Sequence, residues 1–221
     1  MPNPTLTVPA LGVCAMMLAA CTASQPDLAD ADIANVSGIE EAFGTPFTVN
    51  TVGPAAIDPR LLGPQNLPDG LTFDPADCGK VANEQALPPD VKGNMAAVTA
   101  EGDGVRYIVI AVETSEPVPV RSLGEQCRKV TFTGPGIRGL VEVIESPQIQ
   151  DTHTVGTHRV LQTTTQDGPR TGELYNYVAN FGNFIVIVTA NPMVVPDRPV
   201  ARVDTERARE LVTRAVALVK G

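Results

Sequence analysis

Ile108-Val109-Ile110-Ala111-Val112 and Phe184-Ile185-Val186-Ile187-Val188 are the two stretches that determine the architecture of this chain. Neither stretch alternates between apolar and polar residues, as a strand with one hydrated face does. Short uninterrupted apolar runs rich in β-branched residues are typical of strands that are buried on both faces. We therefore expect both stretches to lie at the centre of one sheet that is covered on each side.

Turn residues around these stretches predict antiparallel neighbours. Glycine-rich turns at Gly102-Asp103-Gly104 and Gly134-Pro135-Gly136 each separate two apolar runs, which is a hairpin signal. A short alternating strand is predicted at Phe47, Val49 and Thr51. The remaining predicted strands cover residues 94–101, 105–114, 130–133, 137–144, 158–165, 172–180 and 183–190.

Helices are predicted at both ends of the chain and once in between. Ile33, Val36 and Ile39 recur at helical spacing, and Asp204 is a capping residue ahead of an apolar stripe. A short central helix is predicted to begin at Asp74-Pro75. The expected fold class is α+β: a twisted, mostly antiparallel sheet with N-terminal, short central and C-terminal helices packed on it, as a single domain over residues 32–221.

Leu18-Ala19-Ala20-Cys21 closes an uncharged run that begins at Leu11. The run resembles the end of a bacterial lipoprotein signal peptide, which is cut before a cysteine that then carries acyl chains. The resemblance implies a signal peptide over residues 1–20, lipidation of Cys21 and a tether over residues 21–31. A buried apolar helix is the alternative. Residues 1–12 contain no Lys or Arg, so either a basic leader lies upstream or export is inefficient.

The expected roles of the four cysteines follow from this signal-peptide assignment. Cys14 leaves with the signal peptide and Cys21 is acylated, so Cys78 and Cys127 remain. Outside the cytoplasm a single remaining pair normally oxidises, which predicts a Cys78–Cys127 disulfide. Two separate buried thiols are the alternative.

Composition narrows the classes of partner. The formal net charge is −9, which disfavours nucleic acid, and the aromatic content of 4% without Trp disfavours a sugar-stacking platform. With two or three acyl chains on Cys21, the membrane itself would be a durable partner. The expected location is the outer face of the cell membrane or the cell envelope.

A candidate ligand-binding surface lies on the strand predicted over 172–180. Glu173, Tyr175 and Tyr177 share one face of this strand and could line a surface with Arg106, Arg138 or Arg159 from other strands. The alternative is that the tyrosine rings only cover the sheet, with their hydroxyl groups in water. We expect solvent-reaching hydroxyl groups near an arginine.

Catalytic and metal-binding patterns are weak in this sequence. Asp151, His153 and His158 are the most obvious metal candidates, but their spacing matches no usual zinc pattern, and we interpret them as a solvated strand edge. We find no Gly-x-Ser-x-Gly or His-Glu-x-x-His motif. We therefore expect no metal, no cofactor and no enzyme activity.

The stretches Phe73-Asp74-Pro75-Ala76-Asp77-Cys78 and Tyr175-Asn176-Tyr177-Val178-Ala179-Asn180-Phe181-Gly182-Asn183-Phe184, together with the lipoprotein signal, resemble a mycobacterial lipoprotein family of uncharacterised function over about residues 11–221. More distantly, the chain is similar to the extracellular sensor domains of PknH-type kinases. That resemblance implies an α+β domain that binds an unidentified ligand. This chain departs from it in having one candidate disulfide and no kinase.

Two functions remain open on the sequence alone. The first is a non-catalytic envelope module that binds a small molecule, a lipid or a partner protein. The second is an envelope hydrolase or transferase with an unrecognised site.

Overall fold

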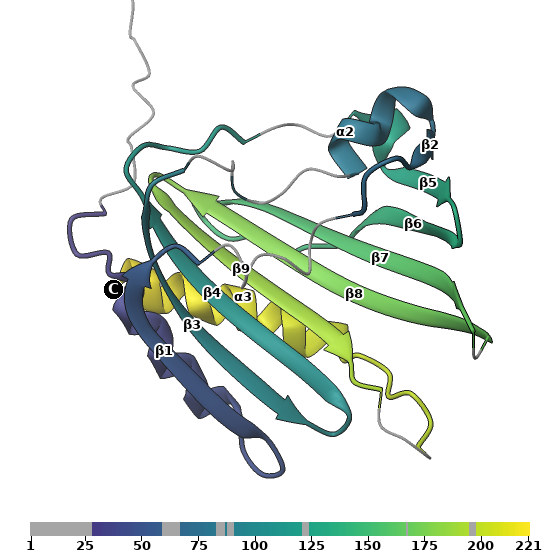
Figure 1. The fold of residues 1–221 in the computed structure, drawn as a ribbon. Coiled ribbons are helices and arrows are strands. Elements are labelled where there is room, and N and C mark those ends of the chain that lie inside the picture. Colours follow the sequence, from purple (N-terminus) through teal and green to yellow (C-terminus); the bar gives the residue numbers. More distant parts are fainter. Residues whose placement is uncertain are drawn as a thin grey trace, which may run out of the picture.

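The computed structural model describes residues 28–58, 67–82, 87, 91–120, 124–166, 168–194 and 198–221. Its centre is one nine-stranded antiparallel sheet in the order β1-β3-β4-β9-β8-β7-β6-β5-β2 (Figure 1). The predicted α+β class with a mostly antiparallel sheet is confirmed. The strands are β1 (Thr48–Ala56), β2 (Thr72–Asp74), β3 (Gly93–Gly102), β4 (Val105–Thr114), β5 (Lys129–Gly134), β6 (Ile137–Ile144), β7 (His153–Thr165), β8 (Gly168–Phe181) and β9 (Phe184–Pro192).

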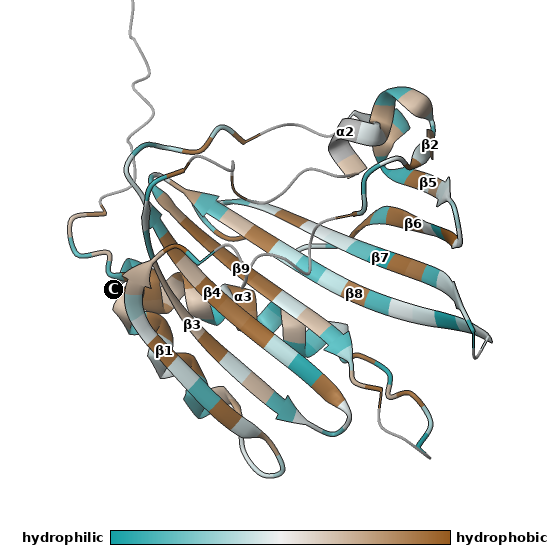
Figure 2. Cartoon of the chain, in the orientation of Figure 1, coloured by the Kyte–Doolittle hydropathy of each residue, from teal (hydrophilic) through white to brown (hydrophobic). Residues whose placement is uncertain are grey.

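The two apolar stretches form the middle of β4 and β9, which lie side by side in the sheet. Val109 to Val112 are 0% exposed, and Val186 to Val188 are equally inaccessible. Alternate residues of β4 pack into different clusters, one on each face of the sheet. The predicted central, doubly buried position of these strands is therefore confirmed. Figure 2 shows the apolar residues concentrated in β4 and β9 and a more mixed pattern along β7 and β8.

Two helices cover one face of this half of the sheet. The 3-10 helix η1 (Ile33–Ala42) lies on β1, β3 and β4, and α3 (Thr205–Lys220) lies on β4, β9 and β8. The side chain of Asp32 accepts a hydrogen bond from the Ala34 amide at 2.8 Å, and that of Asp204 accepts one from the Arg207 amide at 3.0 Å. Both caps satisfy amides that a helix start leaves without a partner. Among the described residues, no helix has the length and apolar character needed to cross a bilayer.

The opposite face has a smaller apolar cluster over the same strands. Ile110, Val112, Ile185 and Ile187 pack there with Met95 and Leu87. β4 and β9 are thus covered on both sides, whereas β7, β6, β5 and β2 extend beyond both helices.

The predicted disulfide is present at the far edge of the sheet. Cys78 and Cys127 are joined with a Cα–Cα separation of 5.4 Å and pack with Ala82 and Val130. Cys78 ends the short turn η3 (Ala76–Cys78), which leads into α2 (Gly79–Ala82), and Cys127 ends η4 (Glu125–Cys127).

One predicted boundary is wrong. Asp74 does not cap the central helix, because it is the last residue of β2 and pairs with Thr131 of β5. Pro75 is extended and precedes η3 without a side-chain cap. Strand pairing thus moves the helix start downstream. The predicted signal peptide, Cys21 and the tether up to residue 27 lie outside the described residues.

The disulfide closes a loop with a sequence separation of 49, so reducing it should lower the free energy of unfolding by about 4 kcal/mol in the chain-entropy model. Urea unfolding with and without dithiothreitol measures this difference. A Cys78→Ala/Cys127→Ala variant is the control and should not respond to reductant. An unchanged midpoint for the reduced wild type would contradict the assignment.

Candidate functional site

One row of side chains crosses the sheet from its covered half to its uncovered half. Paired residues of an antiparallel sheet point to the same face. Tyr107 of β4 opposes Ala190, which opposes Tyr175, which opposes His158. His158 in turn opposes Glu142 of β6. Since Tyr107 and Ala190 pack in the cluster beneath the helices, this row lies on the α3 face of the sheet.

His158 is the centre of a polar cluster on this face. Its Nδ1 lies 3.1 Å from Glu142 Oε1 and its Nε2 lies 3.6 Å from Glu173 Oε2. The Tyr175 ring stacks on the imidazole, with centroids 4.3 Å apart and planes 11° from parallel. The Tyr175 hydroxyl donates to Glu173 Oε2 at 3.4 Å, and Lys129 Nζ lies 3.8 Å from Glu142 Oε2. We call these five residues the His158 cluster.

The surroundings leave this cluster partly open to solvent. The His158 side chain is 15% exposed, compared with 34% for Glu142 and 43% for Glu173. Burial raises the pKa of the Tyr175 hydroxyl, and the nearby Glu173 carboxylate raises it further. Tyr175 therefore stays protonated at neutral pH and remains a hydrogen-bond donor.

The second tyrosine predicted for the site has a different role. Tyr177 is 1% exposed and packs in the cluster beneath α3. We expected its hydroxyl group to reach solvent, and this prediction is wrong because the ring lies under the helix. That hydroxyl makes no hydrogen bond of ordinary geometry within the described part of the chain. Burial raises the pKa of Tyr177, although the Arg209 guanidinium on α3 favours the charged form.

The three predicted arginines do not converge on Tyr175. Arg106 lies on the opposite face, since its neighbour Tyr107 faces the helices, and its Nε donates to Glu101 at 2.6 Å. Arg159 also faces away, because it follows His158 in the strand. Only Arg138 shares the α3 face, where its Nε donates to Gln162 at 2.7 Å, four residues along β6 from Glu142.

The structure also separates the two histidines. His153 and His158 are five residues apart on β7 and therefore point to opposite faces. β7 lies between β6 and β8, but β6 pairs with it only from Gly156 onward. Our interpretation as a solvated strand edge is therefore wrong for His158, whereas His153 pairs with β8 alone and is exposed. Glu142 and Glu173 flank opposite edges of the His158 ring, and no His, Cys, Asp or Glu group in the described ranges is arranged to hold a metal.

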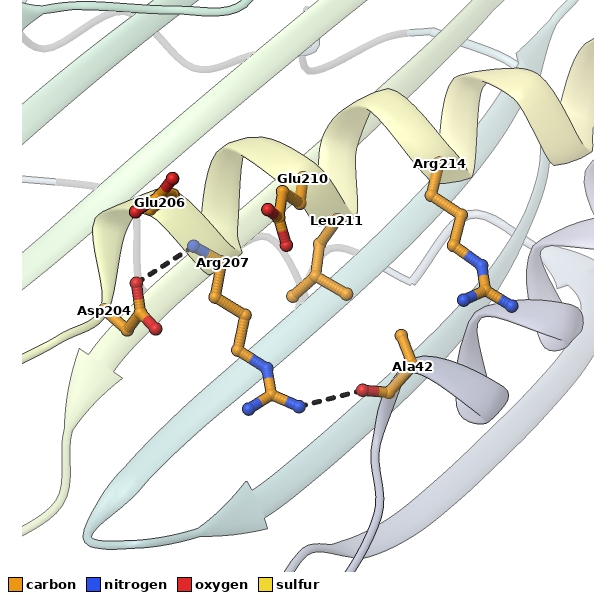
Figure 3. Close-up of a pocket in the computed structure, with 7 residues that line it drawn as sticks. All are labelled: Ala42, Asp204, Glu206, Arg207, Glu210, Leu211 and Arg214. Carbon is orange, nitrogen blue, oxygen red and sulfur yellow. Dashed lines mark hydrogen bonds between the residues drawn. The ribbon is translucent and has the colours of Figure 1, made fainter.

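A separate pocket of about 350 Å³ lies between the first turns of α3 and the end of η1 (Figure 3). Arg207 Nη2 donates to the Ala42 carbonyl at 2.8 Å, and Arg214 Nη2 donates to Glu41 Oε2 at 3.0 Å. An anion in this pocket would have to compete with the Ala42 carbonyl and the Glu41 carboxylate for the two arginines. It would also face the carboxylates of Asp204, Glu206 and Glu210. The pocket is lined by Ala42, Asp204, Glu206, Arg207, Glu210, Leu211 and Arg214.

Arg207 has a structural role in this pocket. Its guanidinium carbon lies 4.7 Å from the Phe47 ring centroid and 5.2 Å from that of Phe43. A cation held over aromatic faces is stabilised by their quadrupoles. Arg207 thus joins α3 to the chain segment that leaves η1, and the His158 cluster is the better candidate for recognition.

Sequence reasoning identified Glu173 and Tyr175 but missed Glu142 and the place of His158 beside them. These residues meet only through the register of β6, β7 and β8, which no local pattern specifies. The one local signal was the alternation of His158, Val160 and Gln162, which places these three side chains on one face of their strand.

Comparison with known proteins places the fold in a family. The family model described as Domain of unknown function (DUF5642) matches residues 32–220. The X-ray structure of an uncharacterised protein from Mycobacterium smegmatis, the Rv0999 ortholog, shares 60% identity with a TM-score of 0.81, covering 87% of this chain and 98% of that chain. The predicted resemblance to a mycobacterial family is confirmed.

A second solved structure is more distant. The extracellular domain of PknH from Mycobacterium tuberculosis shares 13% identity with a TM-score of 0.34, covering 82% of this chain and 91% of that chain. No curated protein matches the chain.

Tyr177→Phe should lower the free energy of unfolding at pH 7 by less than Tyr107→Phe does, because the Tyr177 hydroxyl interacts with Arg209 but makes no hydrogen bond of ordinary geometry. Tyr107→Phe is the matched control. Its hydroxyl donates to the Asp204 carbonyl at 3.4 Å, so its loss should cost about 0.5–1.5 kcal/mol. Chemical unfolding of both variants measures the difference, and a larger loss for Tyr177→Phe would contradict the assigned roles of the two hydroxyl groups.

The two substitutions should also change alkaline stability. Burial raises the pKa of Tyr107 and Tyr177 in the folded state, so the unfolded chain releases these protons first, near pH 10. Wild-type stability should therefore fall as pH rises past about 10, and each Phe variant should lose less. Unfolding curves at pH 7 and above pH 10 measure this loss of stability. An equal fall in the free energy of unfolding for the wild type and both variants would contradict the prediction.

Proposed function

We propose that this chain, which belongs to the DUF5642 family, is a lipid-anchored module of the cell envelope that binds a ligand without catalysing a reaction. The observation that carries the binding role is the His158 cluster. It lies on the α3 face of the sheet, on β8, the last strand that α3 contacts, and on β7, β6 and β5 beyond it. A small molecule, a lipid or a partner protein could approach this face, and the arrangement of polar groups favours certain chemistry.

The groups on this face favour a ligand that donates hydrogen bonds. Glu142 and Glu173 present carboxylate oxygens on side chains that are 34% and 43% exposed, whereas the Nε2 atom of His158 is buried beside Glu173. Leu140 and Val160 lie one step along the strands on the same face and supply apolar contact. Hydroxyl or amine groups on a partly apolar ligand would match this surface.

The proposed anchoring rests on the residues around Cys21 and on the disulfide. A disulfide between Cys78 and Cys127 is typical of proteins that fold in an oxidising compartment. Export with acylation of Cys21 would place the domain in such a compartment. Two or three acyl chains would hold it durably at the membrane.

The alternative function, an envelope hydrolase or transferase, has one observation in its favour. A carboxylate that orients a histidine through Nδ1, as Glu142 does, is part of many general-base arrangements. On the other side of the ring, however, Nε2 faces Glu173 rather than a hydroxyl or thiol nucleophile. This geometry supports recognition better than nucleophilic catalysis.

The anchoring is tested by expression in a mycobacterial host. Mature wild-type protein should partition into the detergent phase and have the mass of residues 21–221 plus acyl chains. Cys21→Ala should remain unprocessed or be released into the medium. An unmodified, full-length, aqueous-phase mass for the wild type would contradict the anchoring.

The binding role is tested by native mass spectrometry of the protein purified from its own host. Wild type should carry an additional bound mass. Tyr175→Ala should retain it roughly three- to tenfold less well, because a ring contact contributes about 0.5–1.5 kcal/mol. His158→Ala should weaken retention similarly by removing the ring on which Tyr175 stacks.

Arg106→Ala and Arg138→Ala are the controls for this experiment. Arg106 lies on the opposite face, and Arg138 lies four residues along β6 from Glu142 and donates to Gln162, so neither loss should weaken retention. Loss of the bound mass in Arg106→Ala alone would contradict the proposed face. Hydrolysis of the bound molecule that depends on Glu142 would instead favour the alternative function.

A further inference from the structure

The first described residues are fixed at one end of the sheet. The Leu28 side chain lies over the β8–β9 turn, where a Cβ built on Gly182 would be 2.5 Å from Leu28 Cδ1. The Ala31 amide donates to the Leu28 carbonyl at 3.2 Å, and the Asp32 amide donates to the Val219 carbonyl at 2.9 Å. The chain is therefore held against the C-terminal turn of α3 from Leu28 onward.

Other connections meet at this same end. Lys220 Nζ donates to the Gln150 carbonyl at 2.8 Å and lies 3.0 Å from Thr152 Oγ1, which ties α3 to the segment between β6 and β7. We call the region of Leu28, Gln150, Gly182 and Gly221 the entry end. The β3–β4 and β7–β8 turns lie at the other end of the strands, as does the start of α3, and we call this the distal end (Figure 1).

The covalent distance from Cys21 limits how far the entry end can be from an acyl chain. Seven residue steps separate Cys21 from Leu28. At no more than about 3.6 Å per residue, they span at most about 25 Å. The 14 residues of β8 extend about 45 Å at roughly 3.4 Å per residue. The attachment therefore holds the entry end within about 25 Å of the acyl chains. This is too short for an inverted domain that stands on its distal end, because the strands are about 45 Å long.

We infer that the entry end is the surface that faces the lipid bilayer, with the strands rising away from it. This inference rests on the proposed anchoring at Cys21. The formal charge of −9 opposes a position in which a broad face of the domain lies on anionic head groups. Tyr175 is six residues from Phe181 along β8, which places the His158 cluster about 20 Å above the entry end. A ligand would then reach the cluster from the aqueous side of the membrane.

Two single-cysteine labels on the same strand test this orientation. His153 and Thr164 are both exposed on β7, at its entry and distal ends respectively. They are about 37 Å apart at roughly 3.4 Å per residue. His153→Cys and Thr164→Cys proteins, acylated in a mycobacterial host, are labelled with a fluorophore. They are then reconstituted in phosphatidylglycerol–phosphatidylethanolamine vesicles that carry a nitroxide on the lipid head group.

The expected result is a loss of fluorescence at position 153 and none at position 164. A Cys21→Ala background should remove the loss at position 153. Equal or stronger quenching at position 164, in protein whose mass shows acyl chains, would overturn the orientation and leave the anchoring intact. A mass without acyl chains would instead overturn the anchoring, and the orientation with it.

Discussion

Burial of β4 and β9 on both faces is the physical constraint from which the other features of this fold follow. Ile110 and Val109 point to opposite sides of the sheet, and both are 0% exposed. Both faces must therefore be covered, by η1 and α3 on one side and by the cluster around Met95 on the other. The two helices extend only as far as β8, so four of the nine strands continue beyond them. The candidate site lies where this cover ends.

The row from Tyr107 to Glu142 shows how position in the sheet decides what a side chain can do. Tyr107 is 2% exposed beneath the helices, and three strands away His158 occupies the same row with its side chain 15% exposed. A tyrosine under the helices contributes packing, whereas Tyr175, at the boundary, can stack on an imidazole and donate to a carboxylate. Carboxylates would be costly to bury beneath α3, and Glu142 and Glu173 are accommodated where this cover ends because water still reaches them.

Much of the fold could be predicted from the sequence, because apolar runs, turn glycines and the Asp204 cap each have a local physical cause. The disulfide partner followed from the assignment of the other cysteines. The exceptions arise from long-range pairing. Asp74 belongs to β2, not to the central helix, because it pairs with Thr131. Arg106 and Arg138 lie on opposite faces because of strand register. The His158 cluster depends on the same register, so its members could be recognised singly but not as a group.

Hydrogen–deuterium exchange of the acylated protein, before and after removal of its co-purified ligand, would show which surface binds. If the His158 cluster is the binding site, ligand removal should increase exchange in peptides covering residues 156–162 and 173–177. Exchange in peptides covering residues 204–214, which line the pocket at the start of α3, should not change. Increased exchange confined to residues 204–214, with none in β7 and β8, would contradict binding at the His158 cluster.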